Sequence, residues 1–166
     1  MSTIKGKVFK YGNNINTDVI FPGKYTYTIT DPQEIAKHSM EDLDPEFVNK
    51  VKPGDVVIGG TNFGCGSSRE QAASCLKYIG VGAIIAKSFS RLYFRNCLNF
   101  GLPPITCAKA VDALESGDDI EVDLLNGKII TGKDTFDIPP LPESIRGIIN
   151  AGGLIPFTRK RLGIDE

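Results

Sequence analysis

The sequence is poor in the side chains that bind metals. It has one histidine, His38, and four cysteines, Cys65, Cys75, Cys97 and Cys107. The cysteines are too far apart for a C-x-x-C metal or redox pair and too few for a disulfide framework. We therefore expect no zinc site and no metal bound by this chain. Cys75 and Cys97 lie among apolar residues and are predicted to be core residues, whereas Cys65 lies beside the site described below.

The sequence also lacks an excess of charge and a long apolar run. With 19 basic and 20 acidic residues, its formal net charge is -1, which excludes the electrostatic footprint of a nucleic-acid-binding or membrane-surface protein. No apolar stretch approaches the ~18 residues of a membrane helix, and the first seven residues contain no apolar segment typical of a signal peptide. We expect a soluble cytoplasmic protein. A length of 166 residues with 41% hydrophobic content predicts one domain, residues 1–166.

What the sequence does contain is a glycine-rich segment with several polar side chains, Asn62-Phe-Gly-Cys-Gly-Ser-Ser-Arg-Glu-Gln-Ala-Ala73. An apolar run between Pro53-Gly54 and Gly59-Gly60 precedes this segment and predicts a buried strand. Apolar residues at helical spacing follow it as far as Gly80, which suits the end of a helix. We therefore expect a strand, a turn and the beginning of a helix.

The turn has the residues of an anion site. Gly64 and Gly66 allow backbone N–H groups to face one point, at the positive end of the following helix. Ser67 and Ser68 add two hydroxyls, and Arg69 adds a planar, charged group that suits a carboxylate. The turn therefore combines an anion site with a candidate nucleophile or base.

A capping box is the alternative interpretation of the same residues. Ser67 and Glu70 have the spacing with which a serine and a glutamate cap the beginning of a helix. A cap leaves unexplained the second serine, the arginine in the first turn and the two glycines. The phosphate-loop motifs G-x-G-x-x-G and G-x-x-x-x-G-K-[ST] are not matched.

The periodicity of the remaining chain predicts an α/β fold. Strands and helices alternate through residue 116, which indicates βαβ units and a mostly parallel sheet. Residues 120–131 then alternate with period 2 around Asn126-Gly127, which is typical of a β-hairpin. The expected strands are residues 4–9, 55–60, 82–86, 103–106, 120–124, 128–131 and 134–140; the expected helices are 31–38, 45–51, 72–80, 88–100, 108–114 and 142–151, followed by a surface tail.

The N-terminal third contains two further segments of interest. Asp18 ends a turn-rich stretch, where an aspartate either caps a turn or orients a catalytic group. Residues 24–30, with two tyrosines and three threonines, form either a strand or a loop tip. Asp31 is expected to cap a helix with Pro32 at its first position, and His38 lies near the end of that helix.

Residues 62–72 resemble the swivelling domain of the aconitase superfamily. Three more segments agree with it in order and spacing: Asn16-Thr-Asp-Val-Ile20, Lys87-Ser-Phe-Ser-Arg-Leu-Tyr-Phe-Arg-Asn-Cys-Leu-Asn-Phe-Gly-Leu-Pro103 and Asp119-Ile-Glu-Val-Asp-Leu124. The resemblance implies the three-layer α/β fold of that domain. A free-standing chain of this length is similar to the small-subunit family shared by 3-isopropylmalate dehydratase and homoaconitase.

The resemblance implies a hydro-lyase reaction in which a hydroxy acid is dehydrated and then rehydrated on the neighbouring carbon. Ser67, matched to the first serine of the motif, would be the catalytic base, acting as an alkoxide. Ser68 and the backbone at Gly66 would stabilise negative charge on the substrate, and Arg69 would bind a carboxylate. Asp18, matched to the Thr-Asp pair of the family, would hold the groups of the site in place.

The resemblance also implies a second protein. In aconitase this domain is fused to three others that hold a [4Fe-4S] cluster, but the cysteines of this chain do not form the converging set of thiolates that such a cluster needs. The cluster is therefore expected on a separate large subunit. This chain alone is expected to be inactive, to place its site at the subunit interface, and to form homo-oligomers when isolated.

The resemblance places substrate choice in the loop after Pro22-Gly23. Aconitase and homoaconitase types have an arginine there for an extra carboxylate, and isopropylmalate types have apolar residues. Burying an unpartnered carboxylate costs several kcal/mol, whereas burying an isopropyl group gains about 0.8 kcal/mol per carbon. The loop lacks arginine, so we predict isopropylmalate as the substrate and a role in leucine biosynthesis. The loop residues are Tyr25, Thr26, Tyr27 and Thr28.

Several alternatives stay open. Lys24 is close enough in sequence to meet a carboxylate, so homoaconitase or a dual-specificity hydro-lyase is the second hypothesis. Outside enzymes of this family, the segment is compatible with an anion- or nucleotide-binding module that acts alone. It is also compatible with a structural subunit whose serines only cap a helix. Replacing Ser67 by alanine separates these classes, because loss of a cap costs only ~1 kcal/mol of stability.

Overall fold

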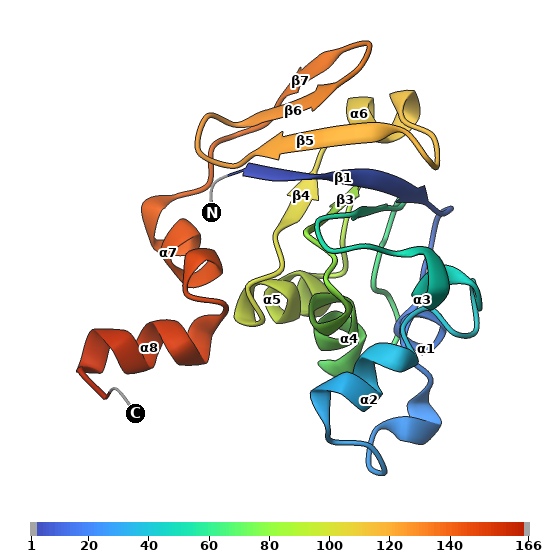
Figure 1. The fold of residues 1–166 in the computed structure, drawn as a ribbon, viewed down its shortest axis with the longest axis vertical. Coiled ribbons are helices and arrows are strands. Elements are labelled where there is room, and N and C mark those ends of the chain that lie inside the picture. Colours follow the sequence, from blue (N-terminus) through green and yellow to red (C-terminus); the bar gives the residue numbers. More distant parts are fainter. Residues whose placement is uncertain (1–2, 165–166) are drawn as a thin grey trace.

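The computed structural model describes residues 3–164, and a seven-stranded sheet forms its centre (Figure 1). The strand order is β4-β3-β2-β1-β5-β6-β7. The strands β1 (Thr3–Lys10), β2 (Val56–Ile58), β3 (Ala83–Ala86) and β4 (Pro104–Thr106) are parallel. The strands β5 (Asp119–Asp123), β6 (Lys128–Thr131) and β7 (Thr135–Asp137) add an antiparallel half. The predicted α/β fold with a parallel part and a hairpin part is confirmed.

The strand β1 joins the two halves of the sheet. Its residues Val8 to Lys10 pair with β2 in parallel, whereas Thr3 to Lys7 pair with β5 in the antiparallel direction. Neither pairing could be predicted from periodicity, because the partners lie about 50 and more than 100 positions away in the chain. The double pairing places the loop after β1 next to the loop after β2.

Each face of the parallel strands carries its own hydrophobic core, because successive side chains of a strand point to opposite faces. Val57, Ile84 and Ala86 pack with the helices on one face, and Val56, Ile58 and Ile85 belong to the core on the other face. The first core is covered by α1 (Thr17–Ile20), α2 (Pro32–Lys37), α3 (Phe47–Lys50), α4 (Gln71–Ile79) and α5 (Arg91–Asn99), and the second by α6 (Ala108–Ala113).

Local signals in the sequence explain where several elements begin and end. The Asp31 side chain accepts the Glu34 N–H at 3.0 Å, and Pro32 is the first residue of α2, as predicted. Gly80 ends α4 in the left-handed conformation, with φ 105°. The Asn126-Gly127 turn connects β5 and β6. Residues 24–30 form a loop rather than a strand, beginning with the short 3-10 helix η1 (Gly23–Tyr25).

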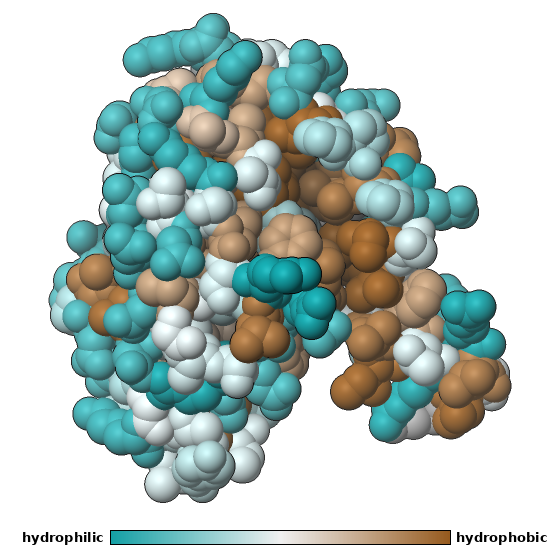
Figure 2. Space-filling view, turned by 180° about the vertical axis from the view of Figure 1, so that it is seen from behind, coloured by the Kyte–Doolittle hydropathy of each residue, from teal (hydrophilic) through white to brown (hydrophobic). Residues whose placement is uncertain are grey.

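The C-terminal segment differs from the prediction. The predicted helix is present as α7 (Glu143–Asn150), but the expected tail contains another helix, α8 (Leu154–Leu162). Its apolar residues do not form a clear helical stripe, so the sequence offered no periodic signal. Figure 2 shows hydrophobic side chains along the side where these helices leave the body, and Ile155 and Leu162 are 68% and 66% exposed. Residues 165 and 166 of the predicted tail lie outside the described residues.

One smaller prediction also needs correction. The turn-rich stretch before Phe21 contains the one-turn helix α1, whose first N–H groups are capped by the Asn16 side chain.

In the part of the chain that the structure describes, residues 3–164, every helix is too short or too polar to span a membrane.

Candidate active site

The candidate site lies where the loops after two neighbouring parallel strands meet. The Gly64 N–H donates to the Ile15 carbonyl at 2.7 Å, and the Thr17 N–H donates to the Cys65 carbonyl at 2.8 Å. These bonds hold the loop after β2 against the segment that follows β1. The carboxyl edge of parallel strands is the usual position of ligand sites in open α/β sheets. The glycine-rich segment singled out by the sequence therefore lies in such a position.

Ser67 is at the centre of this site. Its Oγ accepts a hydrogen bond from Arg69 Nε at 2.8 Å and lies 3.2 Å from Thr17 Oγ1. The backbone N–H of Ser67 also donates to Thr17 Oγ1, at 3.1 Å. Thr17 is only 1% exposed, whereas Ser67 is exposed. If Ser67 loses its proton, its oxygen can only accept, so that both Arg69 and the Thr17 hydroxyl then donate to it.

Arg69 is held from two sides. Its Nε binds Ser67, and its terminal nitrogen Nη2 forms an ion pair with Asp18 Oδ1. The Arg69 side chain is 16% exposed and that of Asp18 is 67% exposed. A Cβ atom at Gly23 would collide with the guanidinium, so this glycine provides the space that Arg69 occupies. The structure thus brings Ser67, Arg69 and Asp18 into contact, and the roles that the family resemblance implies for them stay predictions.

Gly66 and Ser68 flank Ser67. Gly66 has φ 101°, a conformation that favours glycine, and a Cβ atom there would lie 3.3 Å from Thr17 Oγ1. The Ser68 carbonyl accepts a hydrogen bond from Asn96 Nδ2 of α5 at 3.2 Å. The Ser68 hydroxyl is exposed and has no hydrogen-bond partner among the residues that the structure describes. A role for Ser68 and the Gly66 backbone toward a substrate stays a prediction.

The loop predicted to choose the substrate is attached to the site at two points. Gly23 packs against Arg69, and the Thr26 carbonyl accepts a hydrogen bond from Gln71 Nε2 at 3.4 Å, at the beginning of α4. Tyr25 stacks on His38, with ring centroids 3.9 Å apart, and its hydroxyl lies 3.4 Å from Glu41 Oε1. His38 therefore supports this loop instead of facing Ser67.

The four loop side chains have different environments. Tyr25 is half-buried, and the Thr26 hydroxyl is buried without a hydrogen-bond partner among the described residues. Thr28 Oγ1 donates to the Lys24 carbonyl at 3.3 Å, and the Lys24 ammonium lies 5.0 Å from the Tyr25 ring. Tyr27 is 95% exposed. Tyr27 and Thr28 are the exposed residues of the four, and Tyr27 presents the large side chain that a ligand or another protein could contact.

The capping-box interpretation is wrong. The helix α4 begins at Gln71, its N-cap is Glu70, and no side chain caps it. Ser67 lies three residues before that N-cap and binds Thr17 and Arg69 instead. The backbone N–H of Gly64, in the turn expected to face an anion, donates to the Ile15 carbonyl instead, and the neighbouring N–H of Ser67 donates to Thr17 Oγ1.

Sequence reasoning missed Thr17. Asn16-Thr-Asp was noticed as a segment, but only Asp18 was assigned a role. A threonine in a turn-rich stretch has no signal of its own, because its burial depends on the second loop that covers it. The available signal was the polar triplet itself, placed just before a short apolar run.

The described residues do not fit a metal cluster. Among residues 3–164 there is no group of three histidine, cysteine or acidic side chains that could hold a metal ion. Cys75 and Cys97 are completely buried, as predicted, and burial raises the pKa of the Cys75 thiol to about 12. A thiol that resists ionisation is a poor iron ligand, since ligation requires the thiolate. Cys65 is half-buried beside the site.

A separate cavity of about 1040 Å³ lies on another part of the surface, along β1 and β5. Lys5 and Lys7, which line it, form ion pairs with Glu121 and Asp119, so its charges are balanced internally. It contains none of the residues of the Ser67 site. Size alone therefore does not identify the functional site of this chain.

Comparison with known proteins shows that most of this chain is similar to proteins of one family. The family model described as the aconitase C-terminal domain matches residues 5–110. The 3-isopropylmalate dehydratase small subunit of Caldicellulosiruptor bescii is 53% identical over 163 residues, which cover 97% of this chain and 98% of that protein. The isopropylmalate/citramalate isomerase small subunit of Methanocaldococcus jannaschii is 45% identical and covers 99% of both chains.

A solved structure shows the same fold. The crystal structure of 3-isopropylmalate dehydratase from Methanocaldococcus jannaschii superposes with a TM-score of 0.89 at 44% identity. The match covers 98% of this chain and 96% of that one, so it includes the C-terminal helices as well as the sheet.

Proposed function

The chain belongs to the family of 3-isopropylmalate dehydratase small subunits, within the aconitase C-terminal domain, and from this premise we propose how its site works. It is a subunit of a hydro-lyase that interconverts 2-isopropylmalate and 3-isopropylmalate in leucine biosynthesis. The reaction removes water from the hydroxy acid and adds it back with the hydroxyl on the neighbouring carbon.

The observation that carries the proposal is the position of Ser67 Oγ between Arg69 Nε and Thr17 Oγ1. The reaction needs a base that removes a proton from the carbon next to a carboxylate. The Ser67 alkoxide takes this proton, the C–H electrons form the double bond, and the hydroxyl leaves the adjacent carbon. Two hydrogen bonds and the guanidinium charge stabilise the alkoxide before the proton is transferred.

Arg69 serves both the base and the substrate. Its Nε and one terminal nitrogen are used by Ser67 and Asp18, and its remaining N–H groups are available for a substrate carboxylate. A carboxylate bound there would place the acidic carbon close to Ser67. Asp18 keeps the guanidinium in the required orientation, because the ion pair opposes rotation away from Ser67.

The large subunit completes the site in this proposal. Ser67, Ser68 and Asp18 are exposed on the surface, and the described residues offer no metal-binding group near them that could assist the leaving hydroxyl. We place that group, a [4Fe-4S] cluster, on the large subunit, where it would supply a Lewis acid for the hydroxyl. Residues 1–166 would act together as one swivelling domain that closes over the cluster-bearing partner.

The substrate loop supports isopropylmalate. Tyr25 to Thr28 contain no arginine, and the neighbouring Lys24 ammonium lies over the Tyr25 ring, so a third carboxylate would find no guanidinium in this loop. The names of the relatives mention isopropylmalate, and one also mentions citramalate. Both compounds are malates with an apolar group on the hydroxyl-bearing carbon, so citramalate is the second candidate substrate. Homocitrate, with three carboxylates, is the substrate that the loop disfavours.

The test is turnover by this chain reconstituted anaerobically with a cluster-bearing large subunit, on 2-isopropylmalate, citramalate and homocitrate. Each subunit alone serves as control. Activity only in the mixture, highest on 2-isopropylmalate, is the expected result. Equal rates on homocitrate would show that the loop tolerates an extra carboxylate. Complete inactivity would favour the anion-binding module, which calorimetry with malate and phosphate would then detect in the isolated chain.

Self-association of the isolated chain belongs to the same proposal. Tyr27 and the apolar residues of α8 are strongly exposed without the large subunit. We expect light scattering to show dimers or larger species that disappear when the large subunit is added. A monomer at all concentrations would contradict this expectation.

A further inference from the structure

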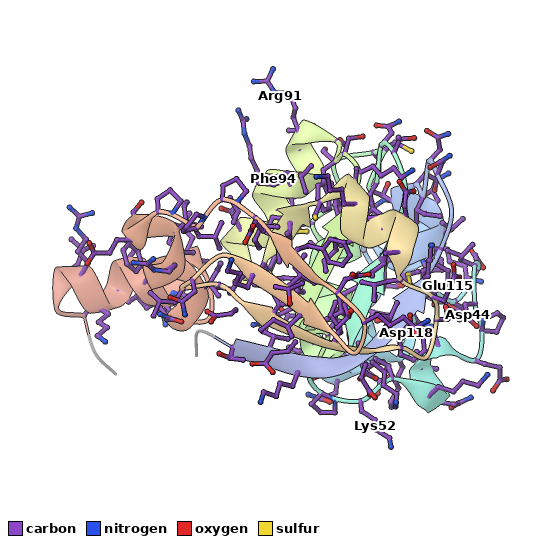
Figure 3. All side chains as sticks on the ribbon, turned by 90° about the horizontal axis from the view of Figure 1, so that it is seen from above. Asp44, Lys52, Arg91, Phe94, Glu115 and Asp118 are labelled. Carbon is purple, nitrogen blue, oxygen red and sulfur yellow. The ribbon has the colours of Figure 1, made fainter. Side chains whose placement is uncertain are left out.

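The segment 87–103 contacts the site described so far through Asn96, and most of its exposed surface has no role there. Its helix α5 carries Arg91 and Arg95, which lie one turn apart and are both exposed. Figure 3 shows Arg91 projecting from α5 away from the body of the molecule. Within residues 3–164, neither arginine has a hydrogen bond or a carboxylate partner for its side chain.

Within the part of the chain that the structure describes, some lysines and arginines form ion pairs with the chain's own carboxylates, and Arg91 and Arg95 are among the exposed ones that do not. The side chains of Lys5, Lys7, Lys10, Lys37, Lys87, Lys128 and Arg69 all form ion pairs with carboxylates of the chain. The acidic residues near α5 do not approach Arg91 or Arg95 in this way. The outer side of α5 therefore presents two positive charges for which the chain itself supplies no partner.

Aromatic and aliphatic side chains surround these charges. Arg91 and Arg95 line a hollow of about 330 Å³ together with Phe89, Phe94, Ser88 and Thr106. Leu92, on the same helix, is 51% exposed. Arginine and aromatic residues are enriched at the energetically important centres of protein interfaces. The composition of the hollow thus suits another protein better than a small polar ligand.

The hollow is continuous with the Ser67 loop. Ser88 Oγ accepts the Asn62 N–H at 2.8 Å, and Asn96 Nδ2 donates to the Ser68 carbonyl at 3.2 Å. Phe63 and Phe89 form a backbone bridge, and their rings are 6.0 Å apart. A protein that covers Ser67 from outside must therefore also lie close to the surface of α5.

We propose that Arg91 and Arg95, with Phe89, Leu92 and Phe94 around them, form a docking surface for an acidic patch of the large subunit. This inference rests on the proposed function, because it takes the partner from there. Carboxylates of the large subunit provide the counter-charges that this chain lacks, and the aromatic residues provide apolar contact. Docking at this position brings the partner's catalytic group to the rim of the Ser67 site.

The electrostatic part of this docking depends on salt. Paired charges at an interface increase the association rate and fix the orientation of the partners, and salt screens them over about 8 Å at physiological ionic strength. An interface that uses Arg91 and Arg95 must weaken as salt rises. If the partner binds elsewhere on this nearly neutral chain, replacing Arg91 and Arg95 should leave the salt dependence of the Kd unchanged.

The experiment compares the full-length wild type with the double variant Arg91→Glu, Arg95→Glu. The control is Lys50→Glu, Lys133→Glu, which changes the net charge equally at exposed positions on α3 and between β6 and β7. The Kd for the cluster-loaded large subunit is measured without substrate by calorimetry, at about 50 and about 300 mM salt. The kcat is then measured at saturating large subunit.

We expect the arginine variant to raise the Kd at least about tenfold at low salt and to lose most of the salt dependence. Its kcat at saturating large subunit stays within about twofold of wild type, and the lysine control keeps both values. The milder variant Arg91→Gln, Arg95→Gln gives an intermediate Kd and shows the effect without charge repulsion. Circular dichroism and thermal unfolding verify that all variants fold.

Three results overturn the docking proposal, and one further result concerns the proposed function alone. An unchanged Kd in the arginine variant shows that the partner does not use this surface. An unchanged Kd with a strong loss of kcat shows that the arginines serve the substrate. A wild-type complex that forms but does not turn over 2-isopropylmalate refutes the proposed function and leaves the docking result valid. Absence of a wild-type complex overturns both.

Discussion

Thr17 Oγ1 lies 3.2 Å from Ser67 Oγ and accepts the backbone N–H of Ser67 at 3.1 Å. A buried side chain that follows β1 therefore positions an exposed hydroxyl that follows β2, 50 positions later in the chain. The same hydroxyl accepts from Arg69 Nε. The alkoxide proposed for the reaction thus has two donors already in place, one neutral and one charged.

Replacing Thr17 by valine should slow the reaction without unfolding the protein. Valine keeps the shape and removes the donor, and a hydrogen bond to a charged group contributes about 1.5–3 kcal/mol. We expect kcat in the reconstituted enzyme to fall roughly 10- to 100-fold. The acid limb of the pH profile of kcat/KM should move to higher pH, because the alkoxide forms less readily. Thr17→Ser should restore both values. A loss of stability with an unchanged pH profile would show a purely structural role.

Replacing Ser67 by alanine should abolish turnover in a folded protein. Loss of a general base costs about 10²- to 10⁴-fold in rate. Because Ser67 does not cap α4, we expect the free energy of unfolding to change by less than about 1 kcal/mol in urea titrations. Ser68→Ala, at the neighbouring exposed hydroxyl that is predicted to bind the substrate, should retain more activity because it leaves the base in place. Residual activity of Ser67→Ala near that of wild type would remove Ser67 from the mechanism.

Replacing Asp18 by asparagine should affect catalysis more than stability. Asp18 is mostly exposed, and exposed ion pairs contribute little to folding. Its loss frees Arg69 to rotate, so we expect kcat/KM to fall by roughly tenfold. Combining Asp18→Asn with Arg69→Lys should cost less than the sum of the separate effects, because the two residues act as one unit. Glu34→Gln, which breaks the exposed Lys37 pair, is the control and should leave kcat/KM unchanged. If the losses of kcat/KM caused by Asp18→Asn and Arg69→Lys simply add in the double variant, the two residues do not act as one unit.

The two tyrosines of the substrate loop should respond differently to alanine. Tyr25→Ala removes the ring that stacks on His38, and we expect it to lower the free energy of unfolding by about 1–3 kcal/mol. Tyr27→Ala should change stability by less than about 0.5 kcal/mol, because this side chain is 95% exposed. In the reconstituted enzyme, Tyr27→Ala should raise the KM for 2-isopropylmalate. An unchanged KM together with an unchanged Kd for the large subunit would leave Tyr27 without a role.

The buried thiols should make the fold less stable in alkali. Burial raises the pKa of Cys75 from 9.0 to about 12 and also raises that of Cys97. Between pH 9 and 12 the unfolded chain releases thiol protons that the native protein keeps. The unfolded state then binds fewer protons, so the free energy of unfolding falls as pH rises, by at most about 1.4 kcal/mol per pH unit for each thiol.

Urea titrations between pH 8 and 11 measure this slope, and Cys75→Ala should make it shallower. Cys107→Ala, at a half-buried cysteine outside the Cys75 core, is the matched control. A slope that does not change on removal of Cys75 would show that other groups cause the alkaline destabilisation.

The sequence by itself determined the features that depend on neighbouring residues. Asp31 with Pro32 predicted the beginning of α2, Gly80 the end of α4, and Asn126-Gly127 the β5–β6 turn. The order of strand-like and helix-like patterns of apolar residues predicted the α/β class. The spacing of apolar residues is informative because it reflects which side of each strand or helix is buried. The composition of residues 64–69 was sufficient to select a candidate site, since glycine, serine and arginine in that order have few structural uses in combination.

Only the tertiary structure decided how distant segments meet. The pairing of β1 with both β2 and β5 depends on the order of strands in the sheet, which local patterns do not contain. That order places Thr17 beneath Ser67 and Asp18 beside Arg69, contacts that replace the capping box. It also exposes Arg91 and Arg95 beside the loop that contains Ser67. Burial and hydrogen bonding of a polar side chain are properties of the surfaces that close around it, and those surfaces exist only after the chain has folded.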